Sequence, residues 1–247
     1  MKTYFPKLRS AQVVEKALDR ICANDIIGVI VGSPGCGRTA ALGHWRRTRA
    51  TPHIWIEATL CGTLQATVGA LAEGLQITRG SIDSTATHIA ERLAEKPIAV
   101  FFDEFDFACP AALNKLRAIW DRAQMIRDTD DERGFPLALL GTHVLRTRLT
   151  LDEERSEQML RRIGEFDEVP TLNMAEIQGV LLAKWQLTAP LLAEGAAEEA
   201  LRLCRGSIGW LNKIIPIALD LAAKDGKVVT AKIIRATSRN LAGLEER

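Results

Sequence analysis

The stretch that decides the fold is IIGVIVGSPGCGRTA, residues 26–40. Its first part, Ile26–Val31, is an uninterrupted apolar and largely β-branched run, the pattern of a strand buried on both faces of a parallel sheet. The next eight residues, Gly32–Thr39, are glycine-rich, and a helix is predicted over Ala40–Arg49. A glycine-rich turn between a buried strand and a helix is the context of a phosphate-binding loop.

The loop matches the phosphate-loop motif at every defining position except one. Its glycines allow successive backbone N–H groups to point at phosphate oxygens, and the helix adds its positive dipole end. The alternative is a glycine-rich strand–helix turn without a ligand. The hydroxyl of Thr39 is predicted to bind Mg²⁺. The residues predicted to hold a nucleotide are Gly32, Ser33, Pro34, Gly35, Cys36, Gly37, Arg38, Thr39 and Ala40.

The departure from the motif is Arg38, which stands where the motif has lysine. Lysine places a compact ammonium between the terminal phosphates, whereas arginine brings a longer, planar fork. Arg38 still attracts phosphate, so three interpretations remain open: a weakened natural ATPase, a nucleotide switch that hardly hydrolyses, or an engineered substitution.

A pair of acids follows the buried run Ile98–Phe102. Ligands gather at the carboxyl ends of strands in open α/β sheets. Asp103 is therefore predicted to hold Mg²⁺ through water, and Glu104 to polarise the water that attacks the nucleotide. Asp106 is predicted to be a solvated acid or a helix cap.

Three further strands and a C-terminal group of helices complete the predicted fold. The strands are His53–Glu57, Leu137–Leu140 and Phe166–Val169, and a helix is expected near Asp152–Ile163. Strands that alternate with helices predict an α/β fold with a doubly wound, parallel five-stranded sheet. After Pro170 the pattern is all-α, which predicts two domains, residues 1–170 and 171–247. The predicted helices of the second are Met174–Trp185, Leu191–Cys204, Gly209–Ala223 and Thr230–Leu241.

Three more residues are candidates for the chemistry. Thr142 follows the fourth strand and is predicted to hydrogen-bond the γ-phosphate or the attacking water. Arg161 and Arg162 precede the fifth strand. One of them is predicted to reach a neighbouring subunit's nucleotide, and the alternative is a pair of surface charges.

Composition excludes several classes of protein. The 247 residues are 47% hydrophobic and 26% charged, which is globular, and the net charge of +1 gives no strong overall field for a polyanion. The five cysteines are scattered without a CxxC pair, so neither a zinc site nor a disulfide framework is indicated. No apolar run reaches the roughly 18 residues that a membrane span needs, and a cytoplasmic protein without membrane contact is expected.

Together these motifs resemble the AAA+ superfamily, and the resemblance covers nearly the whole chain. It implies a helical lid after the sheet, with ATP and Mg²⁺ as ligands. Asp103-Glu104-Phe105-Asp106 and the stretch Leu116–Asp121 resemble the target-selecting ATPases of DNA transposition, that is, the B protein of Mu-like phages and bacterial transposon regulators. Leu139–Thr142 and Gly206–Leu211 also resemble that group.

The resemblance to transposition ATPases implies a homo-oligomer, ring or filament, that assembles on duplex DNA with ATP and recruits a transposase. Many AAA+ proteins carry a sensing arginine in the lid, and the stretch near Trp210 has none. Two alternatives remain: a protein-remodelling or secretion-type ATPase, and a nucleotide switch, neither of which contacts DNA.

DNA, if bound, is predicted to lie along a basic track that contacts its backbone. A ring or filament repeats weak phosphate contacts once per subunit, so these contacts add along the duplex. The alternative is that these cations lie on solvated helix faces. The predicted track consists of Arg79, Lys115, Arg117 and Arg122.

Overall fold

The computed structural model describes residues 7–127, 134–151, 158–187, 191–224 and 228–245. The chain folds into two compact units. The sheet unit comprises Val13–Gly32 and Leu42–Glu168, and the helical unit comprises Ser33–Ala41, Val169 onwards and the residues up to Gln12. The glycine-rich loop is therefore grouped with the C-terminal helices, although it follows β1 directly. The division at residue 170 stays a prediction.

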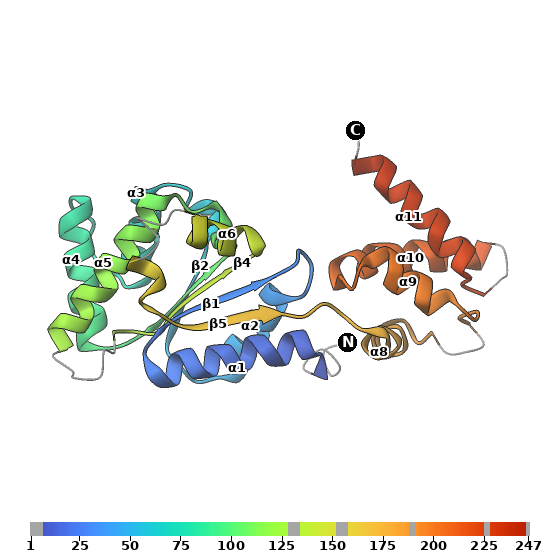
Figure 1. The fold of residues 1–247 in the computed structure, drawn as a ribbon, viewed down its shortest axis with the longest axis horizontal. Helices are drawn as coiled ribbons and strands as arrows, with labels where there is room; N and C mark the ends of the chain where they lie inside the picture. The colour runs from blue at the N-terminus through green and yellow to red at the C-terminus, as the bar shows by residue number, and fades with distance from the viewer. Residues whose placement is uncertain (1–6, 128–133, 152–157, 188–190, 225–227, 246–247) are drawn as a thin grey trace. The chain divides into compact units, whose positions relative to one another are not determined.

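The predicted five-stranded sheet is confirmed (Figure 1). The strand order is β2-β3-β4-β1-β5, and the pairings of β1 with β4, β4 with β3 and β3 with β2 are parallel. Strand β1 lies between β4 and β5, so the order of strands reverses there, at the kind of position where such sheets bind ligands. The strands are β1 (Ile27–Gly32), β2 (His53–Glu57), β3 (Ala99–Asp103), β4 (Leu137–Gly141) and β5 (Ile163–Val169).

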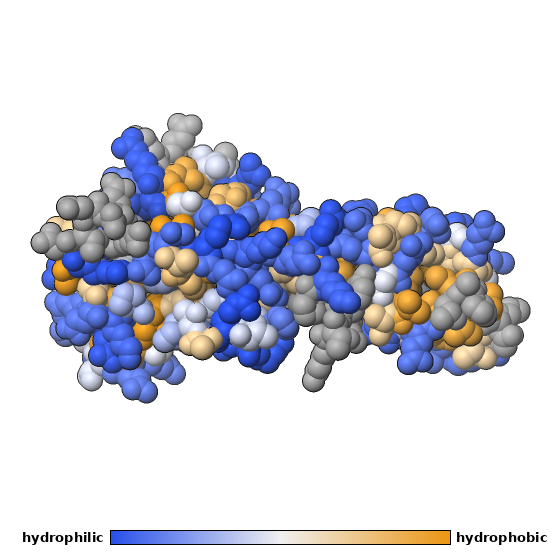
Figure 2. Space-filling model, turned by 90° about the horizontal axis from the view of Figure 1, so that it is seen from below, coloured by the Kyte–Doolittle hydropathy of each residue, from blue (hydrophilic) through white to orange (hydrophobic). Residues whose placement is uncertain are grey.

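Helices cover both faces of the sheet because the central strands are apolar on both sides (Figure 1). On β3, Phe101 packs edge-on against Trp45 with ring centroids 5.1 Å apart, while Phe102 belongs to the core on the other side. Seen from the side of α1, the sheet unit is mainly hydrophilic (Figure 2). The covering helices are α1 (Arg9–Asn24), α2 (Arg38–Thr48), α3 (Leu64–Gly74), α4 (Ile82–Glu95) and α5 (Pro110–Arg127).

Two predictions around the fourth and fifth strands were wrong. A helix, α6 (His143–Leu151), follows β4 where none was expected. Strand β5 begins at Ile163, three residues before the predicted start at Phe166, and the turn at residues 161–162 ends the predicted helix early. Residues 152–157 of that predicted helix lie outside the described residues. The alternating exposure along β5 is typical of an edge strand, and it conceals the apolar signal.

The helical unit contains the four expected helices, and α8 has the predicted bounds. Asn173 caps α8 in a capping box with Glu176, which also pairs with Arg9 at 3.1 Å. Glu199 accepts hydrogen bonds from Arg202 on its own helix and from Arg235, which joins α9 to α11. These hydrogen bonds, that from Arg202 first, lower the pKa of Glu199 to about 2. The helices are α8 (Met174–Trp185), α9 (Ala196–Cys204), α10 (Ile208–Lys224) and α11 (Ala231–Glu245).

None of the described helices is long and apolar enough to span a membrane.

Candidate functional site

The glycine-rich loop has the backbone of an anion-binding turn. Gly35 and Gly37 have φ angles of 76° and 104°, which L side chains rarely adopt. The Cys36 N–H donates to Ser33 O at 3.1 Å, and the Ala41 N–H donates to Gly37 O at 2.9 Å at the start of α2. Residues in the left-handed conformation just before a helix direct successive N–H groups to one side. This arrangement is the physical requirement for binding phosphate.

Arg38 and Thr39 begin α2 directly after this loop. Arg38 is 9% exposed, whereas Thr39 is exposed. A hydroxyl and a carboxylate are the hard oxygen donors that suit Mg²⁺, so the chemistry of Thr39 and Asp103 fits this ion. Among the described residues, no cluster of three or more His, Cys, Asp or Glu side chains forms a separate metal site.

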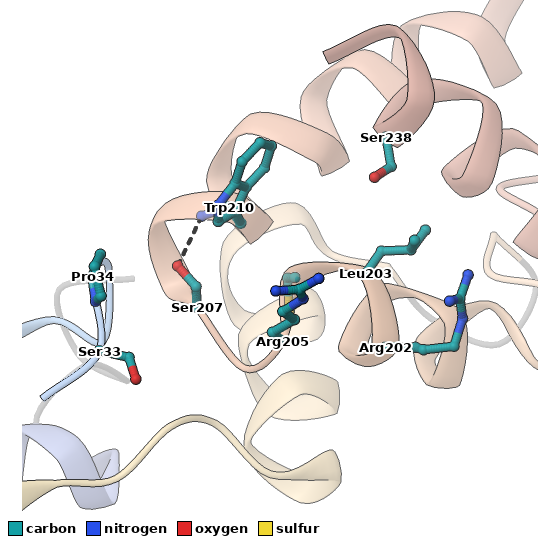
Figure 3. Close-up of a pocket in the computed structure, with 9 residues that line it drawn as sticks. Ser33, Pro34, Arg202, Leu203, Arg205, Ser207, Trp210 and Ser238 are labelled. Carbon is teal, nitrogen blue, oxygen red and sulfur yellow. Dashed lines mark hydrogen bonds between the residues drawn. The ribbon is translucent and has the colours of Figure 1, made fainter. Parts of the chain in front are cut away.

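Within the helical unit the loop contacts the beginning of α10. The Gly209 N–H donates to Gly35 O at 3.2 Å. A Cβ atom at Gly35 would lie 2.2 Å from Ser207 Oγ, and with φ 76° any other residue here would be strained. Ser207 Oγ in turn accepts the Trp210 N–H at 3.2 Å (Figure 3). The backbone of the loop is therefore joined to the beginning of α10 through the carbonyl of Gly35, and the loop's N–H groups take no part in this hydrogen bond.

A cavity of about 610 Å³ lies beside this contact (Figure 3). It is lined by Ser33 and Pro34 of the loop and by residues of the C-terminal helices that include Arg205. Arg205 ends α9 in the left-handed region, with φ 49°. Arg202 also lines the cavity but is bonded to Glu199 at 2.6 Å. The cavity lining thus includes two arginines, Arg202 of α9 and Arg205 at its end, which precede the stretch near Trp210 in the sequence.

The acidic pair lies at the carboxyl edge of the sheet. Phe102 pairs with Leu139 and Val31 with Gly141, so the ends of β3, β4 and β1 reach the same edge. Asp103 is 2% exposed, and its Oδ1 accepts the Glu104 N–H at 3.0 Å. Glu104 has φ 55° and ψ 40°. A left-handed conformation costs a non-glycine residue about 1–2 kcal/mol, and such strain concentrates at functional positions.

Thr142 is held by Asp106, which the sequence analysis predicted to be a solvated acid or a helix cap. Asp106 is only 8% exposed, so the prediction of a solvated acid was wrong. Its carboxylate accepts the Thr142 N–H at 2.8 Å, the Thr142 hydroxyl at 3.0 Å and the Leu145 N–H at 2.8 Å. Arg148 of α6 donates back to the carbonyls of Asp106 and Ala108. These hydrogen bonds connect the segments that follow β3 and β4, and they can form because the two strands are paired.

The remaining predicted site residues lie apart from this edge. Arg162 donates to Asp121 at 2.7 Å from the turn before β5, and its neighbour Arg161 is exposed. Every cation of the predicted DNA track faces an acid. The pairs are Arg79 with Glu73 at 3.0 Å, Lys115 with Asp83 at 2.7 Å, Arg117 with Asp121 at 2.8 Å and Arg122 with Glu91 at 3.7 Å.

Comparison with known proteins identifies the fold. No family model matches the sequence, and no curated protein matches it. Solved structures do: Cdc6p from Pyrobaculum aerophilum matches with a TM-score of 0.63 at 17% identity, over 93% of this chain and 65% of that one. The Orc1 protein of Aeropyrum pernix, solved with DNA, matches with a TM-score of 0.64 at 14% identity, over 94% and 64%.

The Holliday junction branch migration motor RuvB of Thermotoga maritima has a TM-score of 0.57 at 16% identity, over 94% of this chain and 68% of that one. The chain spans less than two thirds of the Cdc6p and Orc1 chains. These likenesses establish the fold, which is the P-loop α/β fold with a helical C-terminal region that the sequence predicts.

Proposed function

We propose that this protein is an ATP-dependent AAA+ ATPase that oligomerises on duplex DNA and recruits a transposase to its target. The observation that carries the nucleotide part is the left-handed turn at Gly35 and Gly37, which follows β1. Asp103 ends β3 and Glu104 follows it, and β3 is separated from β1 by β4 in the same sheet. The DNA part is supported by the structural likeness to the Orc1 protein solved with DNA. The transposition part rests on the resemblance of Asp103–Asp106 and Gly206–Leu211.

In this proposal the loop binds the phosphates of ATP through its backbone N–H groups and through Arg38. Thr39 and Asp103 hold Mg²⁺, which supplies positive charge to the phosphates when it is bound. Glu104 accepts a proton from the attacking water, and a subunit neighbour contributes Arg161 or Arg162.

The hydrogen bonds of Thr142 support one of its two predicted partners over the other. A threonine hydroxyl has one proton, and that of Thr142 goes to Asp106. One oxygen lone pair accepts the Val144 N–H at 3.1 Å. The remaining lone pair accepts a proton from water, whereas phosphate oxygens need a donor. Thr142 therefore acts on the attacking water in this proposal, and not on the γ-phosphate.

The function is tested by binding to a fluorescently labelled duplex of random sequence. Anisotropy should rise with ATP or a slowly hydrolysed analogue, remain low without nucleotide, and fall steeply with salt, because backbone contacts release counterions. Binding that is absent under all nucleotide conditions contradicts DNA function and favours the remodelling or secretion-type ATPase.

Replacement of both Arg161 and Arg162 by alanine should lower ATP turnover at least about tenfold while nucleotide affinity stays near that of the parent, because a finger acts on the partner's γ-phosphate. A Glu104→Gln variant that keeps both arginines should restore part of the turnover when mixed in. The measurement is phosphate release at fixed total protein. If neither effect occurs, the two arginines are surface charges.

A specific feature favours one second function, a nucleotide switch. Arg38 is 9% exposed and replaces the phosphate-loop lysine, so binding and weak hydrolysis are compatible with the same site. In that case ATP controls assembly without repeated turnover.

A further inference from the structure

One cation of the sheet unit is held in place by uncharged groups. Arg46 lies in the last turn of α2, and its guanidinium carbon is 4.5 Å from the centroid of the Trp55 ring on the edge strand β2. Arg46 Nε donates to His53 Nε2 at 3.2 Å. His53 Nδ1 is 2.8 Å from Thr51 O, so Nδ1 carries the proton and the Nε2 lone pair is the acceptor. Stacking and this one bond orient the planar guanidinium, and no residue in the described part of the chain accepts a hydrogen bond from its terminal N–H groups.

Arg46 and its exposed neighbour Arg47 form no ion pair within the described ranges of the chain. The pKa of Arg46 is lowered by burial and then by the positive charge of Arg47, which places the two guanidinium groups in each other's field. Glu57, the acid on the same face of β2, accepts the Thr59 hydroxyl at 3.0 Å.

The neighbouring acids of α1 are engaged by other side chains. Asp19 accepts Arg49 at 2.9 Å and Glu15 lies 2.7 Å from His44. The carboxyl end of α2 carries roughly half a negative charge from its dipole, so it offsets only part of two full positive charges. The pair Arg46 and Arg47, with Trp55 beside it, is therefore a cationic patch that forms no ion pair with any described acid, called the α2 patch below.

The α2 patch differs from the track predicted from the sequence. Arg79, Lys115, Arg117 and Arg122 each face a carboxylate within 2.7–3.7 Å, so a phosphate would have to compete with that acid. At the α2 patch no such competition arises from the described residues. A guanidinium fixed on an aromatic face also loses less side-chain entropy on binding a phosphate than a free one does.

We infer that the α2 patch, Arg46 and Arg47 with Trp55, contacts the phosphate backbone of duplex DNA. The inference rests on the proposed function and specifies where the DNA-contacting surface lies. Arg46 is the oriented, two-pronged donor and Arg47 the exposed charge beside it. The contact involves backbone phosphates and therefore carries no base preference.

The test measures anisotropy of the labelled random-sequence duplex with an ATP analogue, across a salt series, for Arg46→Glu, Arg47→Glu and the parent. Each reversal is expected to weaken binding about tenfold or more, because a phosphate contact is replaced by repulsion. Arg47→Ala should lower the slope of log affinity against log salt by about 0.9. Trp55→Ala and Arg46→Lys keep the charge and should weaken binding less than Arg46→Glu does.

Arg79→Glu and Lys115→Glu are the matched controls, since they reverse cations that already face an acid, and they should bind DNA within a few-fold of the parent. Binding of a fluorescent ATP analogue checks that every variant is folded. If the parent binds DNA and Arg46→Glu and Arg47→Glu bind equally well, the α2 patch is refuted while the DNA function stands. If the parent fails to bind, both the function and the patch are refuted.

Discussion

Glu104→Gln is expected to reduce the rate of ATP hydrolysis by about 100-fold or more while leaving ATP affinity within a few-fold of the parent. The amide keeps the size of the side chain but cannot accept the proton of the attacking water, and general base catalysis contributes about 10²–10⁴-fold. The strained conformation of Glu104, φ 55°, supports a role that the fold maintains at a cost. Phosphate release and fluorescent-nucleotide binding measure the two quantities.

Arg38→Lys is the paired experiment, because parental turnover must be measurable for the first result to be informative. Lysine at this position should raise turnover if the rest of the site is complete. Glu104→Gln on the Arg38→Lys background should then remove the gain. A double variant that hydrolyses ATP as fast as Arg38→Lys alone shows that Glu104 is not the catalytic base. No gain from lysine favours the nucleotide switch.

Asp106→Ala is expected to destabilise the protein by about 3 kcal/mol or more. It leaves the Thr142 N–H, the Thr142 hydroxyl and the Leu145 N–H without their acceptor, and each unsatisfied buried group costs about 1–3 kcal/mol. Urea unfolding followed by circular dichroism measures the change. Unfolding at the parental urea concentration would show that the Asp106 carboxylate does not stabilise the contact between the segments that follow β3 and β4.

Thr142→Val is the matched control for Asp106→Ala. It removes the hydroxyl, and with it the bonds to Asp106 and from the exposed Val144 N–H, but keeps the Thr142 N–H bond to Asp106, so a loss of about 1 kcal/mol is expected. Its effect on nucleotides also separates the two roles of Thr142. A hydroxyl that orients water affects turnover, whereas a hydroxyl that binds the γ-phosphate makes ATP affinity fall more than ADP affinity.

The strands around the site were predictable because they are buried on both faces. Three strands are continuous apolar runs, namely Ile27–Val31, Val100–Phe102 and Leu137–Leu140. The observed ends of these strands differ from the predicted ends by at most one residue. Strand β5 lies at an edge, and its half-exposed alternation hid its first three residues. The short helix α6 carries little amphipathic pattern, and it was missed for that reason.

The sequence by itself determined the glycine-rich turn after the first buried strand, the position of the acidic pair at a strand end and the change from α/β to all-α. Each of these is a local pattern: glycine where φ is positive, apolar residues where strands are buried, and polar residues where those strands end. Only the tertiary structure decided which charges are neutralised and which polar groups are bonded. Asp106 meets Thr142 because β3 lies beside β4, and Arg46 stacks on Trp55 because α2 covers the face of β2. Such contacts join residues far apart in the chain, and no local pattern encodes them.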